Sequence, residues 1–365
     1  MTIIMAEIRK VRIENFKGIK SLEFYPASLN LIVGRNNVGK TSLLEALRLF
    51  FTLQNSESLL YQFRYPAYLL SYGADKGSIE INNKKIEFFR DEKTLIMLVE
   101  KLRKTLEKKI PKYIKSKKAS KLSTEKLVKI IAKNYVIARV DKKLALILDL
   151  NLFLSSSFHP TIFFMLDELS TPIEPHSGWL AKRSKTFPLL SPKYLDEEIL
   201  SFKEAKRKED IEFLLKIERF IKKYKLLEKF ERFQNGFIVI KEGKVIPAEL
   251  FGDGFLQFLI LLFYLEKSEK IALLDEPTAF MHPGYIENFV KYLIEISKAK
   301  KIQIFIATHD IDLIESFLEY PEKKVRSSLK ILRLNKVDDT ILSTTLDYSE
   351  AVREKEKLKM DLRGV

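Results

Sequence analysis

The sequence contains no cysteine among its 365 residues, which excludes disulfide bonds, cysteine-based zinc sites and thiol nucleophiles. Histidine is scarce as well, and the four histidines are too scattered to predict a zinc site. Long hydrophobic runs are missing: the longest, near 255–265, contains Gln257 and is too short to span a bilayer. The first six residues are too few for the apolar core of a signal peptide. We therefore expect a cytoplasmic protein that does not bind membranes.

Acidic residues are too few to balance the basic ones. The chain has 64 Lys and Arg against 49 Asp and Glu, which gives a formal net charge of +15. Because 46% of its residues are hydrophobic, the chain is globular rather than disordered, and its length favours two or three domains. Abundant lysine, glutamate and isoleucine, with no cysteine and few glutamines, is typical of a thermophile.

The excess positive charge is concentrated in one segment. Residues 91–150 carry 17 Lys and Arg against 7 Asp and Glu. Between Lys101 and Lys121 there are ten basic residues and a single acidic one, Glu107. A solvated helix usually mixes its charges for pairs one turn apart, so this imbalance favours contacts with the phosphates of duplex DNA. An ordinary solvated helical face is the alternative.

The most informative stretch is 29–47, with the sequence LNLIVGRNNVGKTSLLEAL. An apolar strand runs into a G-x-x-x-x-G-K-[ST] loop and an amphipathic helix follows, which is the setting that this phosphate-binding motif requires. Loop N–H groups and the positive end of the helix dipole point at the same anion. Lys40 can reach the β- and γ-phosphates, and Thr41 can bind Mg²⁺. The predicted nucleotide-binding residues are Gly34, Arg35, Asn36, Asn37, Val38, Gly39, Lys40, Thr41 and Ser42.

Two carboxylates follow an apolar strand in the last third of the chain. The strand predicted over 270–274 ends at Asp275, which can hold Mg²⁺ through water, and at Glu276, which can orient or deprotonate the attacking water. The next predicted strand, 302–307, ends near His309. Ligands of open α/β sheets bind at the carboxyl ends of strands, so His309 can contact the γ-phosphate. The predicted catalytic residues are Glu276, His309 and Lys40, and the predicted metal ligands are Thr41 and Asp275.

A second glycine-rich helix start lies at Gly252, Asp253 and Gly254, where an apolar helix is predicted over 254–266. Glycines at a helix start make an anion site, for which Asp253 can serve as N-cap. The first loop already holds the nucleotide of the chain itself. The second site therefore suggests a nucleotide shared with another subunit, and an ordinary capped helix is the alternative.

Together these segments resemble the ABC-type ATPase heads of the SMC, RecF and OLD (overcoming-lysogenization-defect) group, and they are most similar to stand-alone, OLD-like ATPases of the AAA family. The matching segments are IENFKGIKSLEF, LIVGRNNVGKTSLLEAL, IPAELFGDGFLQFLILL, IALLDEPTAFMHP and IFIATHD. The resemblance covers about residues 6–52 and 236–312. It implies that the cofactors are ATP and Mg²⁺, and that a head-to-tail homodimer closes over two ATP molecules. In that dimer Gly252–Gly254 would cap the γ-phosphate of the other subunit, Glu276 would be the base and His309 the switch.

Three features depart from the pattern of the family. Asp253 replaces the usual signature serine, and because a carboxylate would repel the γ-phosphate, we expect it to cap the helix or to face a basic group. No glutamine is identifiable as the Q-loop residue. The 56 residues after His309 are too few for the TOPRIM nuclease domain of full OLD proteins, so we expect no nuclease activity from this chain.

The expected fold is an α/β, P-loop, ABC-type ATPase head of two lobes with an inserted helical arm. Lobe I covers 1–90, with strands at 8–16 and 21–25 and a hairpin at 78–90. The segment 91–235 is expected to be a mainly helical basic insertion, with helices over 94–109, 124–138 and 195–233 and a core strand near 161–166. Lobe II covers 236–365, with hairpins at 237–246 and 328–346 and helices over 283–299 and 348–359.

The expected function is slow, Mg²⁺-dependent ATP hydrolysis by an ATP-gated dimer. We expect this dimer to act on duplex DNA in repair or defence and to control a separately encoded nuclease. One alternative is a nucleotide-controlled regulatory clamp for a protein partner. A transporter ATPase subunit fits less well because of the nonstandard signature and the long arm. A GTPase is the last alternative, since Asn335–Asp338 reads N-K-x-D, but no D-x-x-G follows the phosphate loop at a suitable distance.

Overall fold

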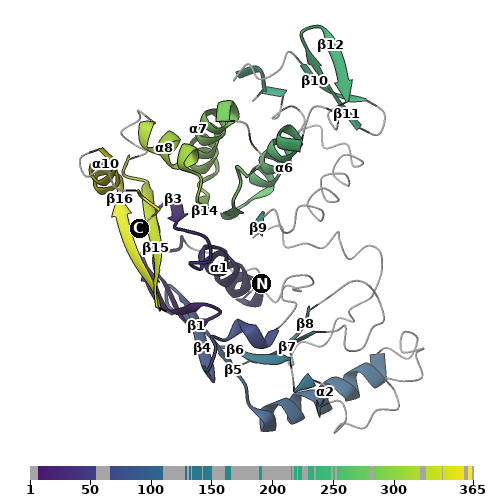
Figure 1. Ribbon diagram of the computed structural model, residues 1–365. Helices are drawn as coiled ribbons and strands as arrows, with labels where there is room; N and C mark the ends of the chain where they lie inside the picture. The colour runs from purple at the N-terminus through teal and green to yellow at the C-terminus, as the bar shows by residue number, and fades with distance from the viewer. Residues whose placement is uncertain are drawn as a thin grey trace. The chain divides into compact units, whose positions relative to one another are not determined.

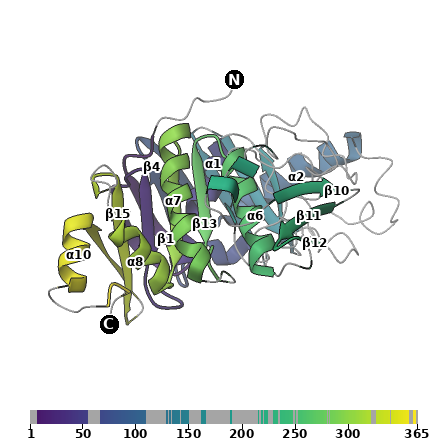
Figure 2. The same cartoon turned by 90° about the horizontal axis from the view of Figure 1, so that it is seen from above.

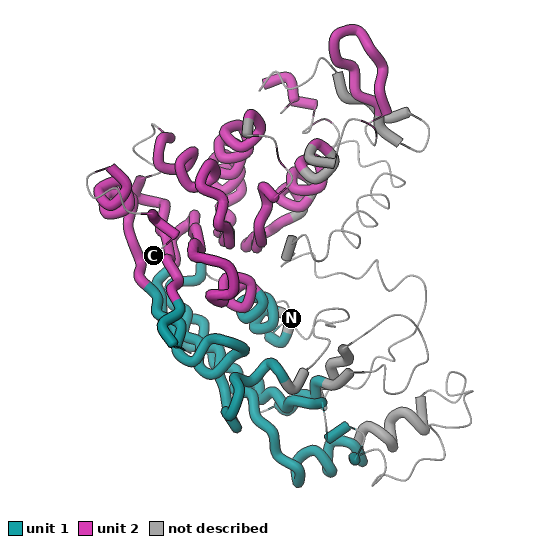
Figure 3. The backbone as a smooth tube through the Cα atoms, viewed as in Figure 1, with its two compact units in different colours: residues 1–25, 45–179, 336–343 teal, residues 26–44, 180–335, 344–365 magenta. Residues whose placement is uncertain are grey.

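The computed structural model describes residues 7–54, 66–109, 128–129, 131–132, 134–141, 143–149, 161–165, 189–190, 215, 218–219, 221–223, 229–233, 236–247, 250, 253–279, 281, 283–320, 326–338, 340–356 and 361–363. The chain divides into two compact units (Figure 3). Unit 1 comprises 1–25, 45–179 and 336–343, and unit 2 comprises 26–44, 180–335 and 344–365. Each unit is therefore assembled from three separate stretches of the chain.

Unit 1 contains an antiparallel seven-stranded sheet in the order β2-β1-β4-β5-β6-β7-β8. Its strands are β1 (Val11–Phe16), β2 (Ile19–Phe24), β4 (Lys76–Ile81), β5 (Lys84–Phe89), β6 (Tyr135–Val140), β7 (Lys143–Asp149) and β8 (Thr161–Met165). A short 3-10 helix, η1 (Pro66–Leu69), precedes β4. The helix α2 (Glu92–Lys109) packs on β5–β7, where Leu95 and Leu98 share a core cluster with Ile137.

Unit 2 is organised around a six-stranded sheet in the order β16-β15-β3-β14-β13-β9. Its strands are β3 (Leu29–Val33), β9 (Leu189–Leu190), β13 (Ile271–Asp275), β14 (Gln303–Thr308), β15 (Leu329–Val337) and β16 (Thr340–Asp347), of which the segment 336–343 is counted in unit 1. The pairs β3–β14, β14–β13, β13–β9 and β3–β15 are parallel. Every residue of β3, β13 and β14 is buried, as expected for parallel strands that are covered on both faces.

Helices cover this sheet in unit 2 (Figure 1). They are α6 (Asp253–Lys267), α7 (Pro283–Lys300), α8 (Ile311–Glu319) and α10 (Tyr348–Glu356). The helices α8, α7 and α6 lie side by side in Figures 1 and 2. Phe317 of α8, Phe289 of α7 and Phe258 of α6 belong to one hydrophobic core that also contains Leu31 of β3. The helix α1 (Lys40–Gln54) begins in unit 2 and continues into unit 1. None of the described helices combines the length and the apolar character needed to cross a membrane.

A separate three-stranded antiparallel sheet also belongs to unit 2, with the order β10-β11-β12. Its strands are β10 (Lys229–Phe233), β11 (Gly236–Lys241) and β12 (Lys244–Pro247). The turn between β11 and β12 contains Glu242 and Gly243, both with positive φ. This turn confirms the hairpin predicted over 237–246.

The helix predicted over 124–138 is wrong at its carboxyl end. Residues 135–138 lie in β6, which pairs with β5 and β7. The segment Tyr135–Val140 reads YVIARV, so its aromatic and β-branched residues suit a strand, and Asp141 makes the turn to β7 with a φ of 55°. The helix predicted over 195–233 likewise ends in a strand, because 229–233 form β10. The domain boundaries at residues 90 and 235 stay predictions.

Most other expected elements are confirmed. The helices predicted over 94–109, 254–266 and 283–299 correspond to α2, α6 and α7, and the late hairpin corresponds to β15 and β16. The N-K-x-D stretch 335–338 is expected from its sequence to form the turn of this hairpin, but Asn335–Val337 are the last residues of β15 and, of the four, Asp338 alone lies in the turn, with a φ of 51°. Of the basic segment 101–121, residues 101–109 lie in α2 and the others lie outside the described residues.

Candidate functional site

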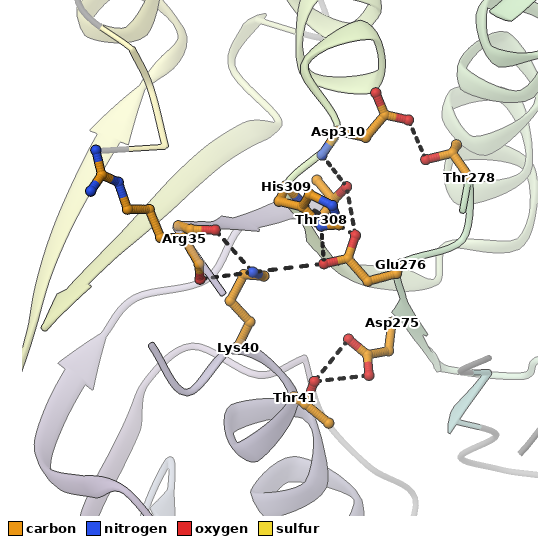
Figure 4. Close-up of polar contacts among 10 residues, drawn as sticks. Arg35, Lys40, Thr41, Asp275, Glu276, Thr278, Thr308, His309 and Asp310 are labelled. Atoms are coloured by element: carbon orange, nitrogen blue, oxygen red, sulfur yellow. Dashed lines mark hydrogen bonds and ion pairs between the residues drawn. The ribbon is translucent and has the colours of Figure 1, made fainter. Parts of the chain in front are cut away.

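Three buried strands of unit 2 end at the same edge of the sheet, and the predicted site lies there. Parallel pairing sets Val33 beside Thr308 and Asp275 beside Ala307. The phosphate loop after β3 and the polar residues after β13 and β14 are therefore neighbours (Figure 4). The carboxyl ends of parallel strands are the usual ligand-binding edge of open α/β sheets.

The phosphate loop has the backbone shape that its glycines permit. Gly39 has a φ of 93°, Asn37 a φ of 65° and Gly34 a φ of 154°. A Cβ atom on Gly34 would lie 2.4 Å from the carbonyl oxygen of Leu334 in β15 and 2.7 Å from Cγ2 of Val38. A residue with a side chain at position 34 would therefore clash with β15, so glycine is required there by packing as well as by the curvature of the loop.

The Lys40 side chain lies along this loop. Its Nζ atom donates to the carbonyl oxygens of Gly34 (2.9 Å) and Arg35 (3.1 Å), and it lies 3.7 Å from Oε1 of Glu276. Burial lowers the pKa of Lys40 below its ordinary value of 10.5, while the charges of Glu276 and Asp275 act in the opposite direction. The buried ammonium group is thus held among carbonyl and carboxylate oxygens that an anionic ligand can replace.

Thr41 and Asp275 meet directly. The Thr41 hydroxyl donates to the Asp275 carboxylate, with Oγ1 at 2.9 Å from Oδ2 and 3.1 Å from Oδ1. Hydroxyl and carboxylate oxygens are the hard donors that Mg²⁺ prefers, and Mg²⁺ is usually bound by one or two protein ligands together with substrate phosphates. The described residues contain no group of three or more His, Cys, Asp or Glu side chains that could enclose a metal ion. The Thr41–Asp275 pair therefore fits a Mg²⁺ ion shared with a nucleotide.

Glu276 is held at the end of β14 by several donors. Its Oε1 atom lies 2.7 Å from Nδ1 of His309, and its Oε2 atom accepts from the His309 N–H (3.2 Å) and the Thr308 hydroxyl (3.3 Å). Its own backbone N–H donates to the Ala307 carbonyl at 2.8 Å, and its φ is 47°. The Glu276 side chain is 21% exposed and that of His309 is 52% exposed, so the pair faces solvent beside Lys40.

Sequence reasoning missed three polar residues of this network. Thr308 lies between Asp310 and Glu276, and the hydroxyl of Thr278 donates to Asp310. Asp310 is also the N-cap of α8, a helix that was not predicted. An aspartate directly before an apolar periodic segment is a helix-start signal and could have revealed α8. No local pattern links Thr278 to Asp310, which lie 32 residues apart.

The structure brings Lys40, Thr41, Asp275, Glu276 and His309 together, as the sequence predicted for one site. Arg35, Asn36 and Asn37 are exposed, Val38 is buried and Ser42 is partly buried in the first turn of α1. The second predicted anion site is described only in part, because Gly252 lies outside the described residues. Asp253 and Gly254 begin α6, and their contact with a second nucleotide stays a prediction.

Comparisons with other sequences place these motifs in a family. A family profile described as "AAA domain, putative AbiEii toxin, Type IV TA system" matches residues 29–315. Uncharacterized protein MJECL11 of Methanocaldococcus jannaschii is 34% identical over 117 residues, which is 31% of this chain and 99% of that protein. The energy-coupling factor transporter ATP-binding protein EcfA2 of Clostridium perfringens is 42% identical over 50 residues, which is 14% of this chain and 18% of that protein.

Solved structures with a similar fold are heads of SMC proteins. The Smc head bound to the C-winged helix domain of ScpA matches with a TM-score of 0.51 and 14% identity, and the match covers 95% of this chain and 100% of that chain. The SMC head domain from Thermotoga maritima matches with a TM-score of 0.45 and 13% identity, covering 94% and 100%. The first match confirms the predicted α/β, ABC-type P-loop ATPase fold.

Proposed function

The chain belongs to the AAA-domain family whose profile spans residues 29–315, and on this premise we propose that it hydrolyses ATP with Mg²⁺. The single observation that carries this proposal is the meeting of four groups at one sheet edge in unit 2. Thr41 contacts Asp275 at 2.9 Å, and Lys40 lies 3.7 Å from Glu276. These are the groups that phosphoryl transfer to water requires for binding phosphate, holding a metal and accepting a proton.

Binding begins at the loop between β3 and α1. Loop N–H groups and the start of α1 attract the phosphates, and Lys40 exchanges the carbonyls of Gly34 and Arg35 for phosphate oxygens. Thr41 and Asp275 would hold Mg²⁺, which supplies charge neutralisation on the β- and γ-phosphates when bound. The Thr41 hydroxyl, which here donates to Asp275, would then turn its oxygen lone pair to the metal.

Hydrolysis depends on Glu276. Its carboxylate is partly exposed and lies 3.7 Å from Nζ of Lys40, beside the position where the γ-phosphate would bind, so it can accept a proton from a water molecule there. His309 bonds Glu276 through Nδ1, and the imidazolium form donates from both ring nitrogens, so it can bridge Glu276 and a phosphate oxygen. Loss of the γ-phosphate would remove one partner of this bridge, which gives His309 its proposed role as a switch.

Variants of Lys40 and Glu276 test the proposed function. Lys40→Ala should lose ATP binding, since the buried cation for the phosphates is gone. Glu276→Gln should keep ATP binding and lower turnover by about 10²–10⁴-fold, because an amide cannot take up the proton. Binding is measured with a fluorescent ATP analogue and turnover by phosphate release. Equal phosphate release by wild type and Glu276→Gln would remove Glu276 from the role of base.

The same proposal includes an ATP-dependent homodimer. Support comes from the start of α6 at Asp253 and Gly254. Like the start of α1, it offers the amino end of a helix, where an anion can bind. In such a dimer, Gly252–Gly254 of one subunit would contact the γ-phosphate held by Lys40 of the other. ATP binding would then close the dimer, and hydrolysis would open it.

For the substrate of this ATP-gated motion we propose duplex DNA. The basic segment 101–121 carries ten Lys and Arg against one Glu, and such a charge imbalance fits the phosphate backbone of a duplex. The segment contains few aromatic residues on which single-stranded bases could stack. A separately encoded nuclease acting in repair or defence would use the clamped duplex.

A second candidate function is a regulatory clamp for a protein partner. It is favoured by the Smc head of similar fold, which was solved bound to the C-winged helix domain of ScpA. A transporter ATPase subunit has less support, because the match to EcfA2 covers only 18% of that protein. DNA binding by this chain separates the first two candidates.

A further inference from the structure

Thr278 and Asp310 connect the segment after β13 to the segment after β14 (Figure 4). The Thr278 hydroxyl donates to Oδ2 of Asp310 at 2.5 Å, and Thr278 is buried. The other carboxylate oxygen of Asp310, Oδ1, accepts from the N–H groups of Asp312 and Leu313 and so caps α8. One oxygen of the Asp310 carboxylate thus accepts from Thr278, and the other caps α8.

The connection continues from Asp310 back to Glu276. The Asp310 N–H donates to Oγ1 of Thr308 at 3.0 Å, and Oγ1 of Thr308 donates to Oε2 of Glu276 at 3.3 Å. Thr278 also lies in the turn that starts at Glu276, since the Ala279 N–H donates to the Glu276 carbonyl at 3.2 Å. Thr278, Asp310, Thr308 and Glu276 therefore form a closed ring of backbone and hydrogen bonds.

We propose that Thr278 and Asp310 are positioning residues for the hydrolytic carboxylate of Glu276. Glu276 has a φ of 47°, a conformation that an L-residue with a long side chain rarely adopts. Such a backbone persists where the surrounding contacts hold it, and the Thr278–Asp310 bond fixes the turn that begins at Glu276. The ring thereby aims one carboxylate oxygen at His309 and the other at Thr308. This inference rests on the proposed ATPase function.

A purely structural role predicts a different result from a positioning role. In Thr278→Val the shape of the side chain is nearly kept and the hydroxyl is lost. The cap of α8 does not use this hydroxyl, because Oδ1 of Asp310 accepts both N–H groups of the first turn. The variant should therefore stay folded with α8 capped, and its unfolding temperature should fall by only about a few degrees for the one lost hydrogen bond, while the geometry of Glu276 becomes less well fixed.

Kinetics of Thr278→Val and Thr278→Ser test the proposal in two backgrounds. In the wild-type background, Thr278→Val should lower kcat about 10-fold with ATP affinity changed less than about 2-fold, since a misplaced catalytic group costs turnover rather than binding. Thr278→Ser, which keeps the hydroxyl, should restore kcat. In the Glu276→Gln background, Thr278→Val should cause no further loss, because the two residues act through one carboxylate.

Three kinetic results would overturn the positioning role. They are an unchanged kcat in Thr278→Val, an equal 10-fold loss in the Glu276→Gln background, and a failure of Thr278→Ser to restore turnover. Circular dichroism melting of each variant separates these results from unfolding. If the wild type hydrolyses no ATP, the proposed function itself fails. The positioning of Glu276 by Thr278 and Asp310 is then tested by a second measurement that does not depend on turnover.

The second readout is the imidazole of His309, which contacts Glu276 at 2.7 Å. The chain has four histidines, and the His309 ring resonance is assigned by its absence in His309→Gln. Thr278→Val should shift this resonance, because the hydroxyl acts on His309 through Glu276. An unmoved His309 resonance in Thr278→Val would overturn the proposal even if ATP turnover had changed.

Discussion

At the residue scale, the phosphate loop is shaped by more than its nucleotide motif. Gly34 ends the segment that β15 approaches, and the Leu334 carbonyl occupies the space of a Cβ atom at 2.4 Å. Lys40 is buried against the same loop and is held by the carbonyls of Gly34 and Arg35. The motif residues therefore satisfy the packing of unit 2 as well as the needs of a phosphate.

The pKa of Lys40 leads to a prediction about pH. Burial lowers this pKa below 10.5, whereas a bound phosphate stabilises the charged form and raises it. ATP affinity should therefore fall as pH rises through the lowered pKa, within a window that ends near 10.5, and binding there should take up a proton. Lys40→Arg stays charged and should flatten this dependence. Calorimetric Kd values from about pH 7 to about pH 10 measure it; a parallel decline for Lys40→Arg would contradict the assignment.

At the element scale, an ion pair joins α10 to the sheet of unit 2. Arg333 of β15 donates from Nη1 to Oε2 of Glu354 in α10 at 2.6 Å, and the two side chains are 11% and 18% exposed. The Nε atom of Arg333 is buried and has no hydrogen-bond partner among the described residues. The Tyr348 hydroxyl donates to the Leu318 carbonyl and attaches the start of α10 to α8. Because both side chains are largely buried, removing one partner should lower the free energy of unfolding more than removing both.

Single and double replacements test this ion pair. Glu354→Leu leaves a largely buried guanidinium without its carboxylate and should destabilise the fold by about 2 kcal/mol. Arg333→Met with Glu354→Leu removes both charges and should recover most of this loss, since a buried pair is often no better than apolar packing. Urea unfolding curves measure the difference.

The matched control is the exposed pair Arg12–Glu14 of β1, whose side chains are 49% and 36% exposed. Glu14→Gln should leave the urea midpoint unchanged, because solvent screens exposed pairs. A double variant of Arg333 and Glu354 that is less stable than Glu354→Leu would show that the pair itself stabilises α10.

At the scale of the whole molecule, the proposed ATP sandwich predicts a change in mass. Glu276→Gln with ATP and Mg²⁺ should elute as a dimer, because ATP persists when turnover is blocked. Gly254→Trp in this background should stay monomeric, since a bulky side chain at the start of α6 would block the shared γ-phosphate. Lys40→Ala is the control and should remain a monomer with ATP. Light scattering that finds a monomer with ATP bound would contradict the sandwich.

The proposed DNA partner is also tested on the whole molecule. Reversing Lys108, Lys109, Lys115, Lys117 and Lys118 to Glu should reduce duplex affinity and its salt dependence, because each lost phosphate contact lowers the slope of log affinity against log salt by about 0.9. ATP turnover without DNA should be unchanged, since none of these residues is among the predicted catalytic, nucleotide-binding or metal-binding residues. Filter binding across salt concentrations with duplexes of unrelated sequence measures both quantities.

A control of equal charge change comes from lysines outside the segment 101–121. It reverses five exposed lysines of unit 2, namely Lys222, Lys241, Lys244, Lys270 and Lys298. This variant should keep the duplex affinity if the contact is local to 101–121. If duplex affinity falls equally in both variants, net charge rather than the segment 101–121 explains DNA binding. That result would favour the protein-partner function.

The sequence alone determined the three buried strands, the loop after β3 and which polar residues follow these strands. Strands such as Leu29–Val33 and Ile271–Asp275 are short apolar runs bounded by glycine or carboxylate, and a parallel sheet aligns their ends. Because of that alignment the sequence predicts that Lys40 and Glu276 lie in one site, and the two side chains are 3.7 Å apart. The family match over 29–315 agrees with the same motifs.

Only the tertiary structure decided which distant residues touch. Residues 135–138 are expected from the sequence to end a helix, although their aromatic and β-branched side chains suit a strand, and in the fold they pair with β5 as part of β6. Thr278 and Asp310 lie 32 residues apart, and their bond exists because β13 and β14 are adjacent in register. The Leu334 carbonyl meets Gly34 for the same reason, through the pairing of β15 with β3. Local periodicity sets which segments become strands, whereas strand order and register, which depend on packing of the entire unit, set which side chains become partners.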